Sequence, residues 1–165
     1  MIQTLNLVKL IYPFILLVAF FCLYRKQYRF MKVFYWKMTM LHEARRFYTR
    51  ILTLVLMLVM WCCMETDFNL TVVASALLSL CFLYYTVADR VLHRLHESKR
   101  LWAATLVVSL VSYSIPHMNS MFLLLFTASM ASIFYPSEKV LSRKSLPGFA
   151  CNKRNLLSMI LNCYY

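Results

Sequence analysis

The sequence predicts an all-α, polytopic helical membrane protein, and three observations support this class. Its 165 residues are 62% hydrophobic and 15% charged, whereas a soluble domain is about half apolar and a quarter charged. Long apolar runs separate short basic segments. Basic segments alternate along the chain with connections that contain no Lys or Arg, as expected when the basic segments all lie on the cytoplasmic side. We expect a helical membrane domain over residues 1–135 and a short basic cytoplasmic tail over residues 136–165.

Five apolar runs are candidate transmembrane helices. A helix that crosses a membrane needs about 20 apolar residues. The last two runs would reach only roughly 22 Å at about 1.5 Å per residue, which is short of the hydrocarbon layer. Two alternatives therefore stay open: five transmembrane helices, or three full spans followed by a membrane-dipping helical hairpin. The five runs cover residues 5–24, 47–64, 70–88, 101–115 and 121–135.

The distribution of cations predicts the orientation of the chain. Seventeen of the eighteen Lys and Arg residues lie in the segments Arg25–Arg50, Arg90–Arg100 and Lys139–Arg154. The connections 65–69 and 116–120 contain none. Under the positive-inside rule, the N-terminus lies outside and the C-terminus lies in the cytoplasm, whether the last two runs cross or form a hairpin. We expect an integral, multi-pass protein of a bacterial inner (cytoplasmic) membrane.

The longest basic segment, a cytoplasmic loop over residues 25–50, also contains seven aromatic residues. On a helical wheel, most of its cations lie opposite an apolar side formed by Phe30, Phe34, Met38, Leu41 and Tyr48. This pattern is typical of an interfacial helix, but helical extensions of the neighbouring spans with snorkelling cations would produce it as well. The predicted contacts with lipid head groups or a partner are Arg25, Lys26, Arg29, Lys32, Trp36, Arg46 and Arg50.

Small residues indicate where helices could approach one another closely. Gly148 is the only glycine and lies outside the predicted spans, so a glycine-based packing motif is excluded. Pairs of small residues four positions apart place both side chains on one helix face. We expect the helix-packing face to contain Ser75 and Ser79 in the third run, and Ala128 and Ser132 in the fifth.

The residues with chemical potential do not form a recognisable catalytic motif. The cores of the second to fifth runs contain no Asp, Glu, Lys, Arg or His, which argues against proton relays and ion-coupled transport. Asp89, His93, His96 and Glu97 would share one helix face, and imidazoles with a carboxylate can bind a metal. The flanking Arg90 and other cations oppose a divalent ion, however. We therefore expect no metal, no cofactor and no enzymatic activity.

These observations predict a function based on contacts. The leading hypothesis is a small non-enzymatic accessory, scaffold or immunity/exclusion-type subunit that acts through helix–helix and inner-face contacts. The alternative is a small channel or carrier for a neutral or lipid-like solute, and a third hypothesis is an inner-face enzyme using His93, His96 and Glu97. The expected partners are anionic lipid head groups and a membrane protein or a second copy of the chain. Nucleic acid is not expected, because the cations lie beside the spans.

Overall fold

The computed structural model describes residues 2–23, 29–66 and 68–136. These residues form seven helices and no strand, so the predicted all-α class is confirmed. The predicted tail after residue 136 lies outside the described residues. The helices are α1 (Ile2–Leu23), α2 (Arg29–Met40), α3 (His42–Thr66), α4 (Leu70–Cys81), α5 (Tyr85–Glu97), α6 (Lys99–Ser114) and α7 (Asn119–Ile133).

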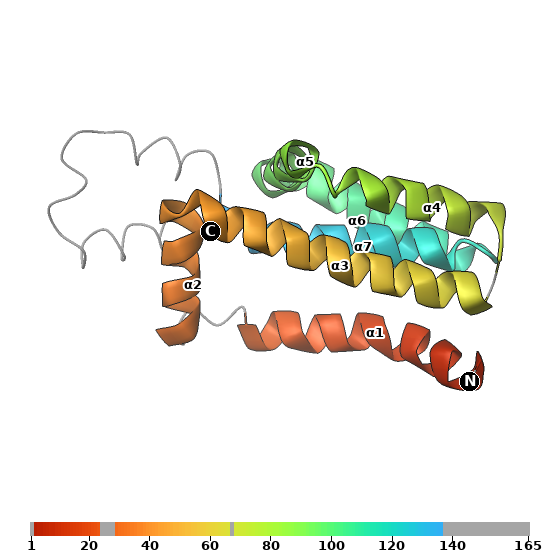
Figure 1. The fold of residues 1–165 in the computed structure, drawn as a ribbon. Helices are drawn as coiled ribbons and strands as arrows, with labels where there is room; N and C mark the ends of the chain where they lie inside the picture. The colour runs from red at the N-terminus through yellow and green to blue at the C-terminus, as the bar shows by residue number, and fades with distance from the viewer. Residues whose placement is uncertain (1, 24–28, 67, 137–165) are drawn as a thin grey trace, which may run out of the picture.

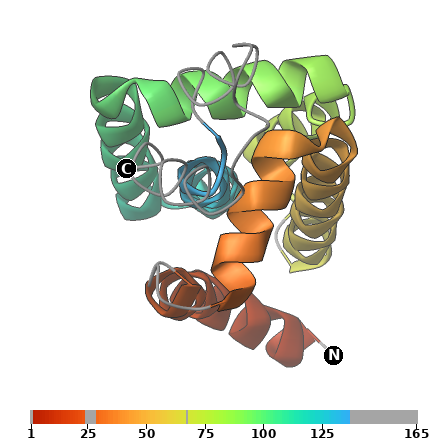
Figure 2. The ribbon, with the colours of Figure 1, turned by 90° about the vertical axis from the view of Figure 1, so that its left-hand side faces the viewer.

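Five of the helices form a bundle, and the other two lie across one end of it. Figure 1 shows α1, α3, α4, α6 and α7 running side by side. The end view in Figure 2 shows α2 and α5 crossing the same end of this bundle. We call this the inner end, because the predicted cytoplasmic segments lie there. The opposite end, where α3 connects to α4 and α6 connects to α7, is the outer end.

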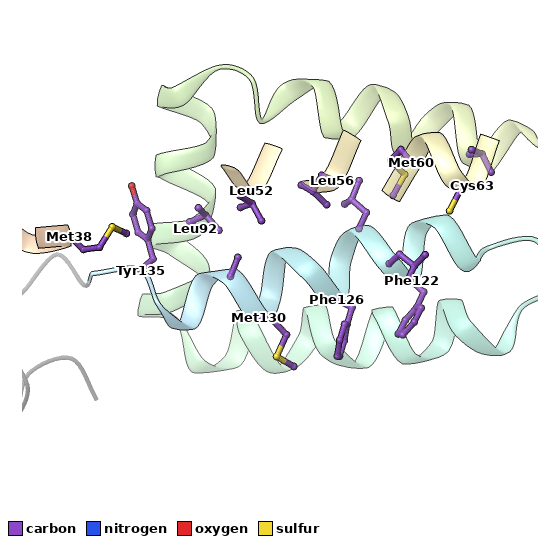
Figure 3. Close-up of a cluster of buried hydrophobic side chains, with 14 residues drawn as sticks. Met38, Leu52, Leu56, Met60, Cys63, Leu92, Phe122, Phe126, Met130 and Tyr135 are labelled. Carbon is purple, nitrogen blue, oxygen red and sulfur yellow. The ribbon is translucent and has the colours of Figure 1, made fainter. Parts of the chain in front are cut away.

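Helix α7 occupies the centre of the bundle. It packs against α1, α3, α4, α5 and α6, and eleven of its fifteen residues are buried. Phe122, Phe126 and Met130 of α7 belong to the same core as Leu56 and Met60 of α3 (Figure 3). The buried hydroxyls of Thr127, Ser129 and Ser132 in α7 donate to carbonyls of the preceding turn of the same helix. This bonding lets a helix rich in Ser and Thr pack in an apolar environment.

The prediction of one continuous third span over residues 70–88 is wrong. Helix α4 ends at Cys81, and α5 begins at Tyr85 after a bend of 100°. The cause is the pattern that follows the bend: Ala88, Leu92 and Leu95 form a single buried stripe, and charged residues occupy the other sides. Such a helix gains most by laying its stripe across the end of the bundle and leaving its charges exposed. Asp89, His93, His96 and Glu97 are therefore not on an extension of α4.

Length and composition indicate which helices could cross a membrane. Within the described ranges, α1 over Asn6–Leu23 and α3 over His42–Thr66 are long and apolar enough to cross a membrane. The bent α4–α5 pair would be a third such element if it is counted as one span. Helix α7 is apolar but shorter, with 15 residues. By length and composition, α1 and α3 could therefore cross a membrane.

Polar contacts join the connections at the outer end. The Lys9 ammonium of α1 donates a hydrogen bond to the Thr66 hydroxyl at the end of α3. The Thr71 hydroxyl donates to the carbonyl of His117 at 2.6 Å, which links the two outer connections. His117 has a left-handed backbone with φ 70°, a conformation uncommon for a residue with a Cβ. The contacts made by Thr71 and by the Asn69 side chain hold it there.

Candidate inner-face site

Helix α2 covers the inner end with one buried side. Met31, Tyr35 and Met38 are each at most 2% exposed, whereas Phe30 is 71% exposed. The predicted apolar side is therefore partly wrong, since Met38 packs in the core while Phe30 and Leu41 face outward. The basic segment contains both a separate helix and an extension of α3. Residues 29–40 form a separate crosswise helix, and residues 42–50 extend α3.

The structure places four of the seven predicted head-group or partner contacts. Lys32 and Trp36 are half-buried on α2, and Arg46 and Arg50 are exposed on α3. Arg29 is the first residue of α2. Lys32 and Trp36 lie one turn apart on α2, and Arg46 and Arg50 lie one turn apart on α3. The side chains of Arg25, Lys26 and Arg29 lie outside the described part of the structure.

Arg46 and Arg50 line a groove of about 710 Å³, which we call the inner groove. It lies between the inner half of α3 and the bend that joins α4 to α5. The guanidinium carbon of Arg46 lies 5.4 Å from the ring centroid of Tyr85, within the range of a cation–π interaction. The Thr53 hydroxyl donates to the carbonyl of Phe82 at 3.0 Å and ties the bend to α3. No acidic residue lines this groove in the described structure.

The predicted helix-packing residues all lie inside the bundle. Ser75 and Ser79 of α4 are completely buried, as is Ser132 of α7, and Ala128 is 5% exposed. The hydroxyl of Ser79 contacts the sulfur of Met57 at 3.8 Å, which places α4 against α3. Small side chains at these positions allow neighbouring helices to approach closely.

Side chains from three neighbouring helices cap the C-terminal end of α7. The carbonyls of Ala131 and Ser132 accept from the backbone N–H groups of Phe134 and Tyr135, and Tyr, Trp and His side chains supply further donors to carbonyls in and just after the last turns of α7. Because a carbonyl only accepts, each histidine carries a proton on Nδ1. The four bonds run from Tyr48 Oη to Ala131 O (2.8 Å), Trp102 Nε1 to Ser129 O (3.0 Å), His96 Nδ1 to Ser132 O (2.9 Å) and His93 Nδ1 to Pro136 O (3.1 Å).

Through these hydrogen bonds, His93 and His96 hold α5 against the C-terminal end of α7. Burial lowers the pKa of His96, while its hydrogen bond to Ser132 opposes that shift. The hydroxyl of Tyr135 donates to the carboxylate of Asp89, so that α5 is also bound to the segment after α7. Glu97 is exposed at the end of α5. Across the described ranges, no three His, Cys, Asp or Glu side chains gather as metal ligands.

Sequence reasoning missed the second half of the inner groove, which residues 82–86 form. The available signal was a change of pattern, since the apolar run 70–83 gives way to the amphipathic stripe of Ala88, Leu92 and Leu95. It also missed a second groove of about 770 Å³ between α1, α6 and α7. This outer groove has Lys9 and Asn119 among its lining residues, together with apolar side chains such as Phe126.

The chemistry that these features offer is binding. The inner groove combines cations with aromatic and apolar walls, and the outer groove is mainly apolar. The chain matches no family model, no curated protein and no solved structure.

Proposed function

We propose that the protein is a non-enzymatic, multi-pass subunit of a bacterial inner-membrane complex, acting as an accessory, scaffold or immunity/exclusion-type component. The observation that carries this proposal is the inner end, where α2 and α5 lie across the bundle (Figure 2). These helices and the start of α3 present exposed cations, among them Lys37, Arg46 and Arg94. Crosswise amphipathic helices with cations suit a membrane surface. They also provide a broad face for a membrane-protein partner or a second copy.

In this proposal α1, α3, α4, α6 and α7 all cross the membrane, with the N-terminus outside and the inner end in the cytoplasm. The side-by-side packing of these five helices supports it (Figure 1). The central position of α7 supports it further, because α7 is enclosed by α1, α3, α4 and α6. Short helices can be accommodated where the bilayer thins locally. The sequence pattern of cations gives the same orientation.

Recovery of the tagged chain from membranes in several mild detergents, followed by mass spectrometry, tests this proposal. We expect a specific membrane-protein partner or a second copy to be recovered with it. Reversing exposed charges with Lys37→Glu and Arg94→Glu should reduce that recovery severalfold. Reversing Glu65→Lys at the outer end is the control and should leave it unchanged. A lone monomer in every detergent would contradict the proposal.

A second candidate function is a carrier for a neutral or lipid-like solute. The outer groove favours it, because apolar residues of α1, α6 and α7 line it and Lys9 and Asn6 add polar groups. Its volume of about 770 Å³ lies within the range of small-molecule sites. Reconstitution into liposomes with a flux assay separates the two functions. Flux that is lost on Leu10→Trp, a substitution of an exposed lining residue that narrows the groove, would favour the carrier.

A further inference from the structure

We propose that the inner groove binds one anionic phospholipid of the cytoplasmic leaflet, with its phosphate between Arg46 and Arg50 and an acyl chain along Leu54 and Met57. This inference rests on the proposed function only in placing the inner end at the cytoplasmic membrane surface. It adds a defined binding site and a class of ligand to the general attraction expected of a basic face.

The order of residues along α3 matches the order of groups in a phospholipid. Arg46, Arg50, Leu54 and Met57 all line the groove, and their spacing of four, four and three places them in one stripe on the helix. The stripe spans roughly 16 Å at about 1.5 Å per residue. It begins with two cations at the inner end and continues with apolar side chains toward the outer end. A head group followed by a hydrocarbon chain has the same polarity over a similar length.

The cationic end of the groove suits a phosphate group. Arginine offers several N–H donors in a planar arrangement that matches phosphate oxygens. Arg46 is positioned by its contact with the Tyr85 ring. Tyr85 and Thr86 are the first residues of α5, and the positive end of that helix dipole adds to the potential of the arginines. The described lining contains no carboxylate to offset these charges.

The apolar end of the groove distinguishes a lipid from a soluble anion. Leu54 is 60% exposed and Leu83 is 62% exposed, so the apolar wall continues onto the outward surface of the bundle. A soluble phosphate would leave these side chains uncovered. An acyl chain would cover them and remain continuous with the surrounding lipid. The volume of about 710 Å³ is also larger than a phosphate group alone requires.

Lipid-dependent thermal stability of the full chain tests the proposal. The chain in a zwitterionic detergent is titrated with phosphatidylglycerol, or with phosphatidylcholine carrying the same acyl chains. We expect phosphatidylglycerol to raise the melting temperature in a saturable way and phosphatidylcholine to have little effect. The double variant R46Q/R50Q should lower the apparent affinity for phosphatidylglycerol at least about tenfold, since charge-assisted hydrogen bonds are lost.

A matched control separates this site from general electrostatic attraction. Arg90 and Arg94 are exposed on α5 and do not line the groove, and the variant R90Q/R94Q removes the same charge. It should keep the affinity for phosphatidylglycerol. If R46Q/R50Q melts much lower without lipid, R46K/R50K preserves the charge and should retain part of the binding. Equal losses in R46Q/R50Q and R90Q/R94Q would overturn the proposal.

Two further outcomes would also overturn it. One is equal stabilisation by phosphatidylglycerol and phosphatidylcholine, which would mean that the head-group charge is not recognised. The other is equal stabilisation by glycerophosphate alone, which would assign the groove to a soluble anion. Failure here and failure of the proposed function are distinguishable. The titration uses purified chain without a partner, whereas the proposed function is tested by recovery of a partner from membranes.

Discussion

At the scale of single residues, the bundle depends on small side chains where helices meet. Ser75 and Ser79 are completely buried on α4, and their hydroxyls donate to carbonyls one turn earlier. They therefore bring no unsatisfied polar group into the interior. Each leaves room for a neighbouring helix that a larger side chain would occupy.

Enlarging one of these residues should destabilise the fold. Ser75→Leu inserts extra methyl and methylene groups into a packed interior, which costs about 1–3 kcal/mol, and we expect a lower melting temperature in detergent. Ala74→Leu is the matched control, because Ala74 is exposed on the same helix, and it should change the melting temperature little. Equal effects of the two substitutions would show that Ser75 does not lie at a close helix contact.

At the scale of elements, the inner end is held together around the last turn of α7. Tyr48 of α3, Trp102 of α6 and the two histidines of α5 donate to carbonyls in this region. Crosswise α5 is thereby fixed to the bundle by hydrogen bonds as well as by its apolar stripe. We expect the bonds from buried donors to contribute measurably to stability.

Removal of the Tyr48 hydroxyl tests this contribution. Tyr48→Phe removes one donor to the Ala131 carbonyl, which keeps the backbone N–H of Phe134, so the loss of this hydrogen bond should cost about 0.5–1.5 kcal/mol and lower the melting temperature. Tyr84→Phe provides the control, since Tyr84 is 72% exposed and its hydroxyl can bond to water. A melting temperature unchanged by Tyr48→Phe would contradict the proposed role of the bond.

The stability of the inner end should also depend on pH. Burial lowers the pKa of His96 below its ordinary value of 6.5, so the unfolded chain binds more protons than the folded chain near and below that pH. The stability associated with neutral His96 is thus present above pH 6.5 and is lost as the pH falls through the folded pKa. We expect the melting temperature to decrease between pH 7.5 and pH 5.5.

The variant His96→Gln isolates this effect. Glutamine keeps an N–H donor for the Ser132 carbonyl but does not titrate. The decrease in melting temperature over the same pH range should therefore be smaller in His96→Gln than in the unmodified chain. An unchanged pH dependence would assign the effect to other groups.

The helical class could be predicted from the sequence because apolar runs and cation spacing are local properties. The break after α4 could not be predicted by a search for apolar runs, since residues 82–88 are themselves largely apolar. The bend follows from the amphipathic stripe of Ala88, Leu92 and Leu95. The extent of α2 was predicted only in part, because its buried side is set by the helices beneath it.

At the scale of the whole molecule, the main feature that sequence reasoning did not provide is the central position of α7. Each predicted span is apolar, so hydrophobicity alone does not rank them by burial. The cluster of small residues over 127–132 was the available hint. The same limit applies to the inner groove. Arg46 and Arg50 were identified as contacts, but their partners across the groove come from a distant part of the chain.

The central claim is that the five bundle helices cross the membrane with the inner end in the cytoplasm. The most direct test places single cysteines, in a cysteine-free background, at Phe68 and Ile115 near the outer end and at Arg94 on α5. We predict that a membrane-impermeant maleimide labels Phe68→Cys and Ile115→Cys in intact cells, and labels Arg94→Cys only after the membrane is opened. Labelling of Arg94→Cys in intact cells, or protection of Ile115→Cys from the outside, would contradict the claim.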